Sequence, residues 1–371
     1  MDSGESLAFY LPSLTGGGAQ RVTVNLANGF VDRGVNVDLV VSYHTGELRH
    51  EVGDGVSIVD LKTPRIPLVG VGASIPALGR YLERETPSVL FSQMHYANVV
   101  SVVAHWLSTT ETALVLTEHT IFGKASQPKD TLMFSLAKRS HPLADHVIAV
   151  SSGVAESVRN NVDIPDSKVS VINNPIVTPS LRGRTEAAID HPWLVDPGVD
   201  VILGVGRLAP EKDFTTLVRA IALAQEANPS LHLVILGEGP RREELHRVAE
   251  NLEVDDRVSL PGYVDNPYAY MRRADVFALS SKREGLPTAL VEAMACGCPV
   301  VATDCRSGPR EILHDGRYGP LVPVGDSEAL AAEIERTLRN PVSSDVLKKR
   351  AGDFSTETVL NEYEQLVDRL V

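Results

Sequence analysis

Short runs of apolar and β-branched residues alternate along this chain with longer amphipathic stretches. The short runs predict strands and the longer stretches predict helices, and their alternation is typical of βα units on a parallel sheet. In the first half, strands are predicted at residues 7–11, 35–42, 56–61, 89–92, 113–117, 146–150 and 169–172. The helices predicted between them lie at residues 19–33, 74–85, 98–107 and 130–141.

The alternation stops after residue 172 and then starts again. Residues 173–198 are punctuated by Pro and Gly and lack periodicity, which is typical of a linker. Beyond the linker, strands are predicted at residues 200–205, 232–236, 258–261, 276–279, 300–303 and 320–323, and helices at 214–226, 241–251, 267–273, 288–296 and 328–338. We therefore predict an α/β fold of two doubly wound, Rossmann-like domains that face a central cleft, with the substrate at the carboxyl ends of their strands.

The last stretch of the chain predicts one more amphipathic helix, at residues 356–370. Val359, Tyr363, Leu366, Val367 and Leu370 recur at helical spacing, so their side chains form one apolar face that must pack on something. We expect this helix to pack back on the N-terminal domain. The predicted domain boundaries are then 1–178, a linker at 179–198, 199–354, and a C-terminal helical segment at 355–371.

Composition and charge exclude several classes of protein. A length of 371 residues suggests two or three domains at roughly 150 residues each. With 35 Lys+Arg against 48 Asp+Glu, the net charge is −13, which is the wrong sign for a protein whose main partner is bulk nucleic acid. Three cysteines confined to one stretch do not form a disulfide framework and favour a reducing, cytoplasmic setting. No signal peptide and no apolar run of about 18 residues is found, which leaves contact with a membrane surface open.

Two loops that follow predicted strands carry residues suited to an anionic ligand. Gly16, Gly17 and Gly18 precede a helix, where backbone N–H groups can approach a phosphate, although a tight turn explains these glycines equally well. After the strand at 200–205, Arg207 and Lys212 place two cations in the more acidic half of the chain. Such a pair suits a pyrophosphate, and two solvated loop cations are the alternative. The same segment superficially matches a dinucleotide fingerprint, but the predicted helix begins too late for one.

The segment after the strand at 276–279 is the most informative. Glu284 lies in the loop, and Pro287 suits the first position of a helix. Glu292 follows on a helical face that is otherwise apolar, where a carboxylate is costly to bury without a partner. We therefore interpret Glu292 as a binding residue that accepts hydrogen bonds from a diol.

Taken together, these segments resemble the retaining, two-domain GT-B glycosyltransferases of family 4, which use nucleotide sugars. The resemblance covers nearly the whole chain, and its most specific mark is the pair Glu284 and Glu292 with seven residues between them. The matching motifs are Gly17-Gly18-Ala19-Gln20-Arg21, Val205-Gly206-Arg207-Leu208, Glu211-Lys212-Asp213-Phe214, Leu236-Gly237-Glu238-Gly239, Glu284-Gly285-Leu286-Pro287, Glu292-Ala293-Met294-Ala295-Cys296-Gly297 and Asp315-Gly316 to Gly319.

The resemblance implies a role for each matching residue. Arg207 and Lys212 would hold the donor diphosphate, Glu292 the ribose hydroxyls, and Glu284 would approach the transferred sugar. His119, a looser match, would lie near that sugar. The catalytic residues expected in this way are Glu284, His119, Lys212 and Arg207. The expected donor-binding residues are Gly17, Gly18, Arg207, Lys212, Gly262, Tyr263, Val264, Glu284, Gly285, Leu286, Pro287, Thr288 and Glu292.

The implied function is transfer of a sugar, with retention, from a UDP-sugar or another nucleotide donor to a glycan or a lipid-linked glycan. The chain contains no Asp-x-Asp, so neither a metal ion nor another cofactor is expected. The leaving diphosphate can itself take the acceptor's proton. A nucleotide-sugar epimerase of the same fold and a non-catalytic carbohydrate-binding protein are the alternatives, and the presence of both cations and both glutamates favours the transferase.

Two groups of residues in the N-terminal domain suggest a surface for a lipid-linked acceptor at the cytoplasmic face of a membrane. Lys62 and Arg65 flank an apolar loop, and further cations follow His119. A solvated basic face is an equally good interpretation. The apolar residues of the loop are Leu68, Val69, Val71 and Ile75, and the further cations are Lys124, Lys129, Lys138 and Arg139.

Overall fold

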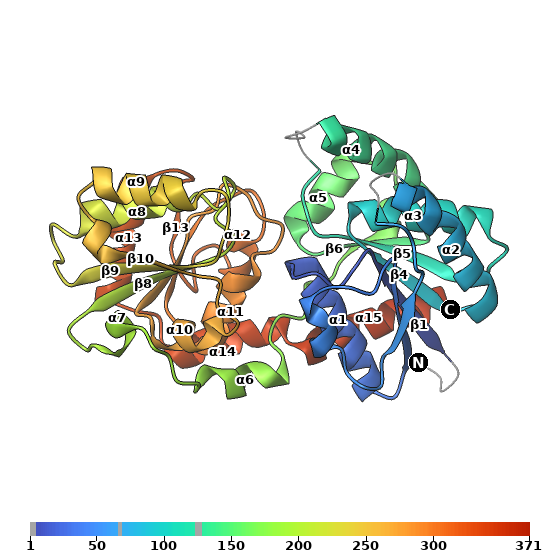
Figure 1. Cartoon of the computed structure of the whole chain (residues 1–371), viewed down its shortest axis with the longest axis horizontal. Coiled ribbons are helices and arrows are strands. Elements are labelled where there is room, and N and C mark those ends of the chain that lie inside the picture. Colours follow the sequence, from blue (N-terminus) through green and yellow to red (C-terminus); the bar gives the residue numbers. More distant parts are fainter. Residues whose placement is uncertain (1–4, 66–68, 123–127) are drawn as a thin grey trace. The chain divides into compact units, whose positions relative to one another are not determined.

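The computed structural model of the chain describes residues 5–65, 69–122 and 128–371. These residues form two compact units, which we treat separately (Figure 1). The N-terminal unit comprises the described residues up to Pro175 together with Thr356–Val371, and the C-terminal unit is Ile176–Ser355. Each unit is a parallel sheet covered by helices, so the predicted fold of two Rossmann-like α/β domains is confirmed.

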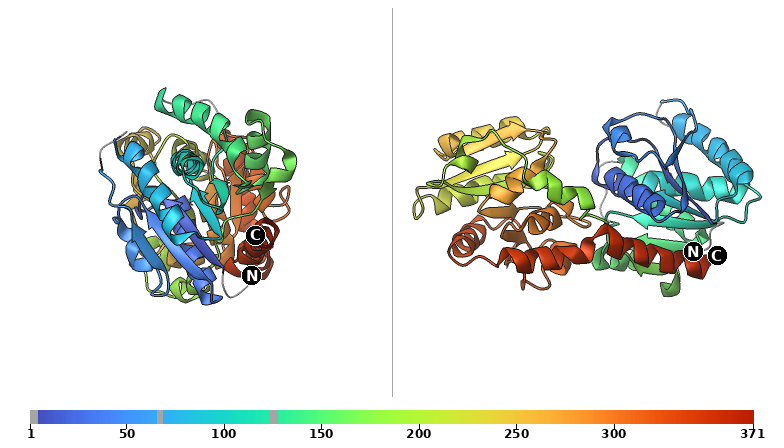
Figure 2. Two further views of the ribbon diagram at one scale, coloured as in Figure 1. Left: turned by 90° about the vertical axis from the view of Figure 1, so that its right-hand side faces the viewer. Right: turned by 90° about the horizontal axis from the view of Figure 1, so that it is seen from below.

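The N-terminal unit is built on a seven-stranded parallel sheet of order β3-β2-β1-β4-β5-β6-β7. Helices cover both faces of the sheet (Figure 2). The strands are β1 (Ser6–Leu11), β2 (Asn36–Val41), β3 (Ser57–Asp60), β4 (Val89–Gln93), β5 (Ala113–Glu118), β6 (His146–Ala149) and β7 (Val169–Val171). The helices are α1 (Gly18–Asp32), α2 (Val69–Glu85), α3 (His95–Leu107), α4 (Pro128–Ser140), α5 (Ser152–Asn161) and α15 (Thr356–Leu370).

The core of the N-terminal unit includes side chains from the end of the chain. Residues 7–11 of β1 and 89–91 of β4 are continuous apolar runs because both faces of these strands are covered. Phe9 of β1 stacks on Phe91 of β4 with 5.0 Å between ring centroids, and Tyr363 of α15 lies 5.3 Å from Phe91. Helix α15 thus lies against the sheet of the N-terminal unit, and its bounds equal those predicted from the sequence.

The C-terminal unit has a six-stranded parallel sheet of order β10-β9-β8-β11-β12-β13. Its strands are β8 (Asp200–Val205), β9 (Leu231–Leu236), β10 (Val258–Gly262), β11 (Val276–Leu279), β12 (Val300–Thr303) and β13 (Leu321–Val322). Its helices are α6 (Pro179–Thr185), α7 (Pro192–Val195), α8 (Phe214–Ala224), α9 (Arg242–Asn251), α10 (Pro267–Arg273), α11 (Thr288–Cys296), α12 (Pro309–Ile312), α13 (Ser327–Arg339) and α14 (Ser344–Ala351).

The structure corrects the predicted linker. Residues 179–198 are not an aperiodic connection, because they contain the helices α6 and α7 and belong to the C-terminal unit. Both helices begin with a proline, Pro179 and Pro192, at their first helical position. Because each spans two turns or fewer, neither can show a helical period in the sequence.

The strand order of each sheet determines where ligands can bind. In both sheets successive strands are added first to one side and then to the other, so the order reverses between β1 and β4 and again between β8 and β11. At such a switch point the loops that leave the carboxyl ends of the strands diverge and leave a crevice. The predicted site residues follow β1 and β5 in one unit and β8, β10 and β11 in the other.

Candidate functional site

In the C-terminal unit, the loop after β8 brings Lys212 back over the end of the strand. Gly206 has φ 157°, and a Cβ atom built on it would lie 3.3 Å from Lys212 Cε. The lysine chain therefore runs directly over the glycine backbone. Arg207 is exposed at the same turn. The two predicted cations are thus held on one loop at the carboxyl end of β8.

Lys212 forms an ion pair with the loop after β11. Its Nζ lies 2.6 Å from Glu284 Oε1, and Ser281 Oγ donates a hydrogen bond of 2.6 Å to the same oxygen. The side chain of Glu284 is only 11% exposed and that of Lys212 is 22% exposed. A carboxylate at that depth needs a compensating charge, so the pair holds the β8 and β11 loops together at the switch point.

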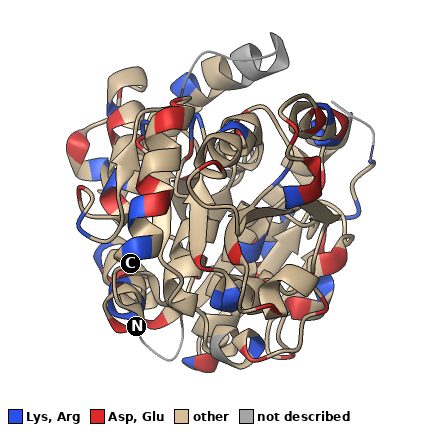
Figure 3. Cartoon of the chain, turned by 90° about the vertical axis from the view of Figure 1, so that its left-hand side faces the viewer, with Lys and Arg blue, Asp and Glu red and all other residues tan. Residues whose placement is uncertain are grey.

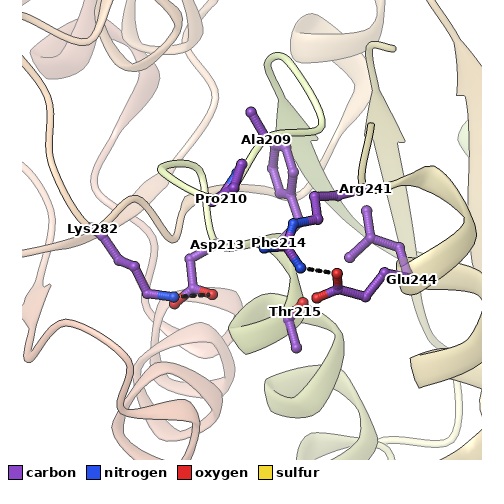
Figure 4. Close-up of a pocket in the computed structure, with 9 residues that line it drawn as sticks. Ala209, Pro210, Asp213, Phe214, Thr215, Arg241, Glu244 and Lys282 are labelled. Carbon is purple, nitrogen blue, oxygen red and sulfur yellow. Dashed lines mark hydrogen bonds and ion pairs between the residues drawn. The ribbon is translucent and has the colours of Figure 1, made fainter. Parts of the chain in front are cut away.

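Asp213 does not cap helix α8 with its side chain, although it occupies the N-cap position. Its Oδ1 pairs with Lys282 Nζ at 2.9 Å, and its Oδ2 accepts a hydrogen bond of 2.7 Å from Thr216 Oγ1. Figure 4 shows this pair at one side of a small pocket whose other side is formed by Arg241 and Glu244. At about 70 Å³, the pocket is too small to hold a nucleotide sugar.

The loop between β11 and α11 is fixed by buried contacts. Pro287 is the N-cap of α11 rather than its first residue, and it is buried. Gly308 has φ 91° and packs closely against Pro287. A Cβ atom added to Gly308 would be 2.4 Å from Pro287 Cδ. Ser307 Oγ donates a hydrogen bond of 2.9 Å to the carbonyl oxygen of Gly285. The first turn of α11, from Thr288, is thereby held with its amide N–H groups at the carboxyl edge of the sheet, where they favour negative charge.

Glu292 lies in the second turn of α11 and is half-buried, as its apolar neighbours predicted. The Tyr268 hydroxyl of helix α10 donates a hydrogen bond of 3.3 Å to Glu292 Oε1. Tyr268 was not predicted as a site residue. The two residues are 24 positions apart on different helices, and nothing in the sequence pairs them.

The loops after β9 and β10 form the remaining edge of the candidate site in the C-terminal unit, which is called the half-site below. Gly262 has φ 95°, and its carbonyl oxygen accepts a hydrogen bond of 2.8 Å from the Gly237 amide. A Cβ on Gly262 would lie 2.7 Å from Glu238 Oε1, which Arg242 holds through a 2.8 Å ion pair. Tyr263 is 68% exposed and Val264 partly so. This edge is therefore preformed and open to a ligand.

The three cysteines are free and buried, as predicted. Burial raises the pKa of Cys296 to about 12 and that of Cys305 to about 12. Since the thiolate is the reactive form, neither residue is available as a nucleophile near neutral pH. The chemistry of the half-site therefore rests on its carboxylates and cations.

In the N-terminal unit, the glycine loop follows β1. Gly17 is the N-cap of α1 in an extended conformation, and the Gly16 amide donates a hydrogen bond of 2.9 Å to Glu47 Oε1. A Cβ added to Gly18 would meet no atom within 4 Å. The local backbone thus does not require glycine at position 18, and the space beside Gly18 is open.

His119 directly follows β5. Its Nε2 lies 2.8 Å from the buried Gln93 Oε1, a hydrogen bond across the ends of β5 and β4. The pKa of His119 is lowered to about 4, because the effect of burial outweighs that of the negative charge on Glu118, which would raise it. His119 is therefore neutral at pH 7, and as a neutral imidazole it can donate or accept a hydrogen bond with a ligand.

Glu118 anchors a cluster of histidines in the N-terminal unit. The side chain of Glu118 is 1% exposed; its Oε1 lies 2.6 Å from His141 Nε2, and its Oε2 lies 2.6 Å from His95 Nδ1. Asn98 Nδ2 donates a further hydrogen bond of 2.8 Å to Oε1. Burial alone would raise the pKa of Glu118, but the two histidines outweigh it and hold that pKa below its usual range.

Met94, between β4 and α3, has an unusual backbone conformation. Its φ of 85° with ψ of 142° is a region that non-glycine residues rarely occupy and that costs on the order of 1–3 kcal/mol. His95 follows Met94 directly and lies at the carboxyl edge of the sheet, where its Nε2 is 2.8 Å from Thr120 Oγ1. His95 was missed as a candidate site residue because it gains its carboxylate partner only through the fold.

The predicted basic surface is seen only in part. Lys62, Arg65, Lys138 and Arg139 are exposed. Leu68 and Lys124 lie outside the described residues, and the side chains of Val69, Val71 and Lys129 are likewise not described. Figure 3 shows acidic residues interspersed with basic ones over the described chain. In the described part of the chain, no helix is both long and apolar enough to cross a membrane.

Two family models match this chain, one for each half. Residues 16–179 match the model described as "Glycosyltransferase Family 4" and residues 187–354 match "Glycosyl transferases group 1". Together the two matches cover the candidate residues of each unit, including the glycine loop, His119, Lys212 and both glutamates.

Similar proteins match over most of their length. The N-acetylgalactosamine-N,N'-diacetylbacillosaminyl-diphospho-undecaprenol 4-alpha-N-acetylgalactosaminyltransferase of Campylobacter jejuni is 29% identical over 94% of this chain and 94% of its own. The lipopolysaccharide core biosynthesis glycosyltransferase LpsE of Rhizobium meliloti is 31% identical over 60% of this chain and 64% of its own. The crystal structure of Anabaena HepE in complex with UDP has a TM-score of 0.78 with 20% identity, covers 98% of this chain and 100% of that chain, and shows the same fold.

Proposed function

The chain belongs to the family 4 glycosyltransferases of the GT-B fold, and from this premise we propose that it transfers a sugar from a UDP-sugar to a glycan or lipid-linked glycan, with retention and without a metal ion. The observation that carries the proposal is the ion pair of Lys212 and Glu284 at the switch point of the C-terminal sheet. It places a cation and a carboxylate together at the edge where a phosphorylated sugar is expected to bind.

The donor is proposed to lie along the carboxyl edge of the C-terminal unit. Lys212 and Arg207 bind the diphosphate, together with the amide N–H groups of the first turn of α11. Glu284, which Lys212 holds in place, accepts hydrogen bonds from hydroxyls of the transferred sugar. Glu292 accepts hydrogen bonds from the ribose, and the loop at 262–264 contacts the base. The UDP complex of the similar HepE structure supports uracil as that base.

Transfer is proposed to proceed by attack on the face that the diphosphate leaves. As the bond from the anomeric carbon to the diphosphate oxygen breaks, negative charge grows on the leaving group and positive charge on the sugar. Lys212 and Arg207 neutralise the leaving group, which takes the proton of the attacking hydroxyl. These two cations would supply the charge that a metal ion otherwise provides. The neutral His119 and the loop of Gly17 and Gly18 are proposed as further residues that bind sugar and phosphate groups.

Titration of donors by calorimetry tests this function. UDP-sugars are expected to bind, and GDP- and ADP-sugars to bind at least about 10-fold more weakly. Glu292→Ala is expected to weaken UDP binding at least about 10-fold, because the ribose loses charge-assisted hydrogen bonds. Transfer to a glycan acceptor, followed by NMR of the product, is expected to show the donor's own anomeric configuration and to be unaffected by EDTA. An inverted product, or activity that EDTA removes and a divalent ion restores, would contradict the mechanism.

We further propose that a lipid-linked acceptor brings the N-terminal unit to the cytoplasmic face of a membrane. The Campylobacter relative is named for a diphospho-undecaprenol substrate, and Lys62, Arg65, Lys138 and Arg139 are exposed here. The protein is expected to float with liposomes that contain anionic lipid and to remain in solution with neutral ones. Failure to float at low salt with either composition would rule out a stable membrane contact.

A further inference from the structure

Helix α10 contributes the side chain of Tyr268 to the donor half-site. The tyrosine is 8% exposed, and its hydroxyl donates to Glu292 Oε1 at 3.3 Å. A carboxylate can accept hydrogen bonds in several directions, and its plane turns about the last side-chain bond. A buried phenol that binds one oxygen restricts this rotation. Glu292 is therefore oriented by a residue of another helix.

Tyr268 is itself contacted by a residue of helix α6. The Arg184 guanidinium carbon lies 4.9 Å from the centroid of the Tyr268 ring, a cation–π contact. The guanidinium also donates to the carbonyl oxygen of Asp265, and Asn266 Nδ2 donates a hydrogen bond of 2.8 Å to the carbonyl oxygen of Arg184. Arg184 is thus fixed at its backbone and at its side-chain end by residues that immediately precede α10.

These contacts join two parts of the donor half-site. Residues 262–264, proposed to contact the base, lead within a few residues to Asp265 and Asn266, which bind Arg184, and then to Tyr268, which binds Glu292. One continuous segment therefore positions both the base-binding loop and the ribose-binding carboxylate. Arg184 connects this segment to α6.

We propose that Tyr268 is a positioning residue that orients Glu292 for the two ribose hydroxyls of the donor, with Arg184 fixing the tyrosine ring. The inference rests on the proposed role of Glu292. It gives the enzyme a means of discriminating a ribonucleotide from a nucleotide without ribose hydroxyls. Tyr268 contributes to the binding of the donor and not to the breaking of its bond.

The test compares calorimetric dissociation constants for UDP and for UDP that lacks both ribose hydroxyls (dideoxy-UDP). Tyr268→Phe keeps the ring and its contact with Arg184 but removes the hydroxyl. We expect it to weaken UDP binding about 5- to 10-fold and to leave dideoxy-UDP binding unchanged, because the dideoxy compound makes no use of an oriented Glu292. In transfer assays the KM for the donor should rise by a similar factor at unchanged kcat.

Tyr270→Phe is the matched control, since it removes a hydroxyl from the same helix, where the ring packs near His191 instead of Glu292. It should leave both dissociation constants unchanged. Equal weakening of UDP and dideoxy-UDP by Tyr268→Phe would show a merely structural role and overturn the inference, as would no effect on UDP. The proposed role of Glu292 is tested separately: if Glu292→Ala weakens both compounds equally, Glu292 does not bind the ribose and the proposed function itself is at fault.

Discussion

Replacing Lys212 with alanine is expected to lower kcat for sugar transfer about 1000-fold at saturating donor. The ammonium group would no longer neutralise the charge that develops on the leaving diphosphate, and removal of one such group from an active site typically costs ~3–4 kcal/mol of transition-state stabilisation. Arg207 lies on the same loop but is exposed. We expect that it cannot replace Lys212, because Lys212 is the cation that lies over Gly206 and pairs with Glu284.

The same substitution also leaves Glu284 without its cation. Since that carboxylate is 11% exposed and is then held by Ser281, some loss of stability is expected, up to about 3 kcal/mol. Activity must therefore be measured well below the unfolding temperature of the variant. Circular dichroism and thermal unfolding then distinguish an inactive folded enzyme from an unfolded one.

Lys282→Ala provides the matched control. Lys282 also pairs with an acidic residue of the β8–α8 loop, Asp213, at 2.9 Å, but its side chain is 54% exposed and is not proposed to contact the donor. Asp213 is only 8% exposed but keeps its hydrogen bond from Thr216 Oγ1, so some loss of stability is expected here too. Measured well below its unfolding temperature, this variant should retain kcat within about threefold, because neither residue is proposed to contact the donor. Near-normal turnover in Lys212→Ala, or an equal loss in Lys282→Ala, would disprove the assignment of the diphosphate to Lys212.

Much of the fold could be predicted because it depends on local pattern. Strand β11 and helix α11 have the predicted bounds, since an apolar run of four residues ends at a polar loop and Gly297 ends the helix with φ 81°. Helix α15 was predicted for the same reason, since its apolar face has a clear helical period. The short helices α6 and α7 could not be predicted, because a helix of two turns or fewer is too short to show a repeating helical pattern.

The candidate site was predictable only where one segment carries its chemistry. Glu284 and Glu292 stand on a single loop and helix, so their spacing and their apolar neighbours indicate a function. The partners of these residues come from elsewhere in the chain: Glu284 pairs with Lys212, 72 positions away, and Glu292 with Tyr268. Sequence spacing cannot show such pairs, because they depend on which strands the sheet places next to each other.

The cluster around Glu118 illustrates the same limit. His95, Glu118 and His141 have no spacing that links them, and a histidine taken alone indicates nothing. Parallel pairing of β4 with β5 sets the ends of these strands side by side and brings His95 to the carboxylate. Burial raises the free-energy cost of the charge on Glu118. That burial is likewise a property of the folded unit and not of the strand sequence.

Ending the chain after Ser355 is expected to unfold the N-terminal unit. The deletion removes helix α15, whose Val359, Leu360, Tyr363, Leu366 and Val367 are buried in the core formed with β1, β4 and α1. At about 1.5–3 kcal/mol for each buried apolar side chain, the loss is of order 10 kcal/mol. Since the free energy of unfolding of a domain is about 5–15 kcal/mol, the remaining residues cannot maintain this core.

The point substitution Tyr363→Ala tests the same packing in a chain that can still fold. The Tyr363 ring lies 5.3 Å from Phe91 and 6.4 Å from Phe30, so its removal leaves a cavity beside two aromatic rings and should cost about 3–5 kcal/mol. Hydrogen exchange followed by mass spectrometry should show faster exchange in peptides from β1, β4 and α1, with peptides from β8 to β11 unchanged. Gln365→Ala, on the exposed face of the same helix, is the control and should change neither set. Unaltered exchange in the β1 and β4 peptides of Tyr363→Ala would mean that the stability of the N-terminal unit does not depend on α15, although the helix lies in its core.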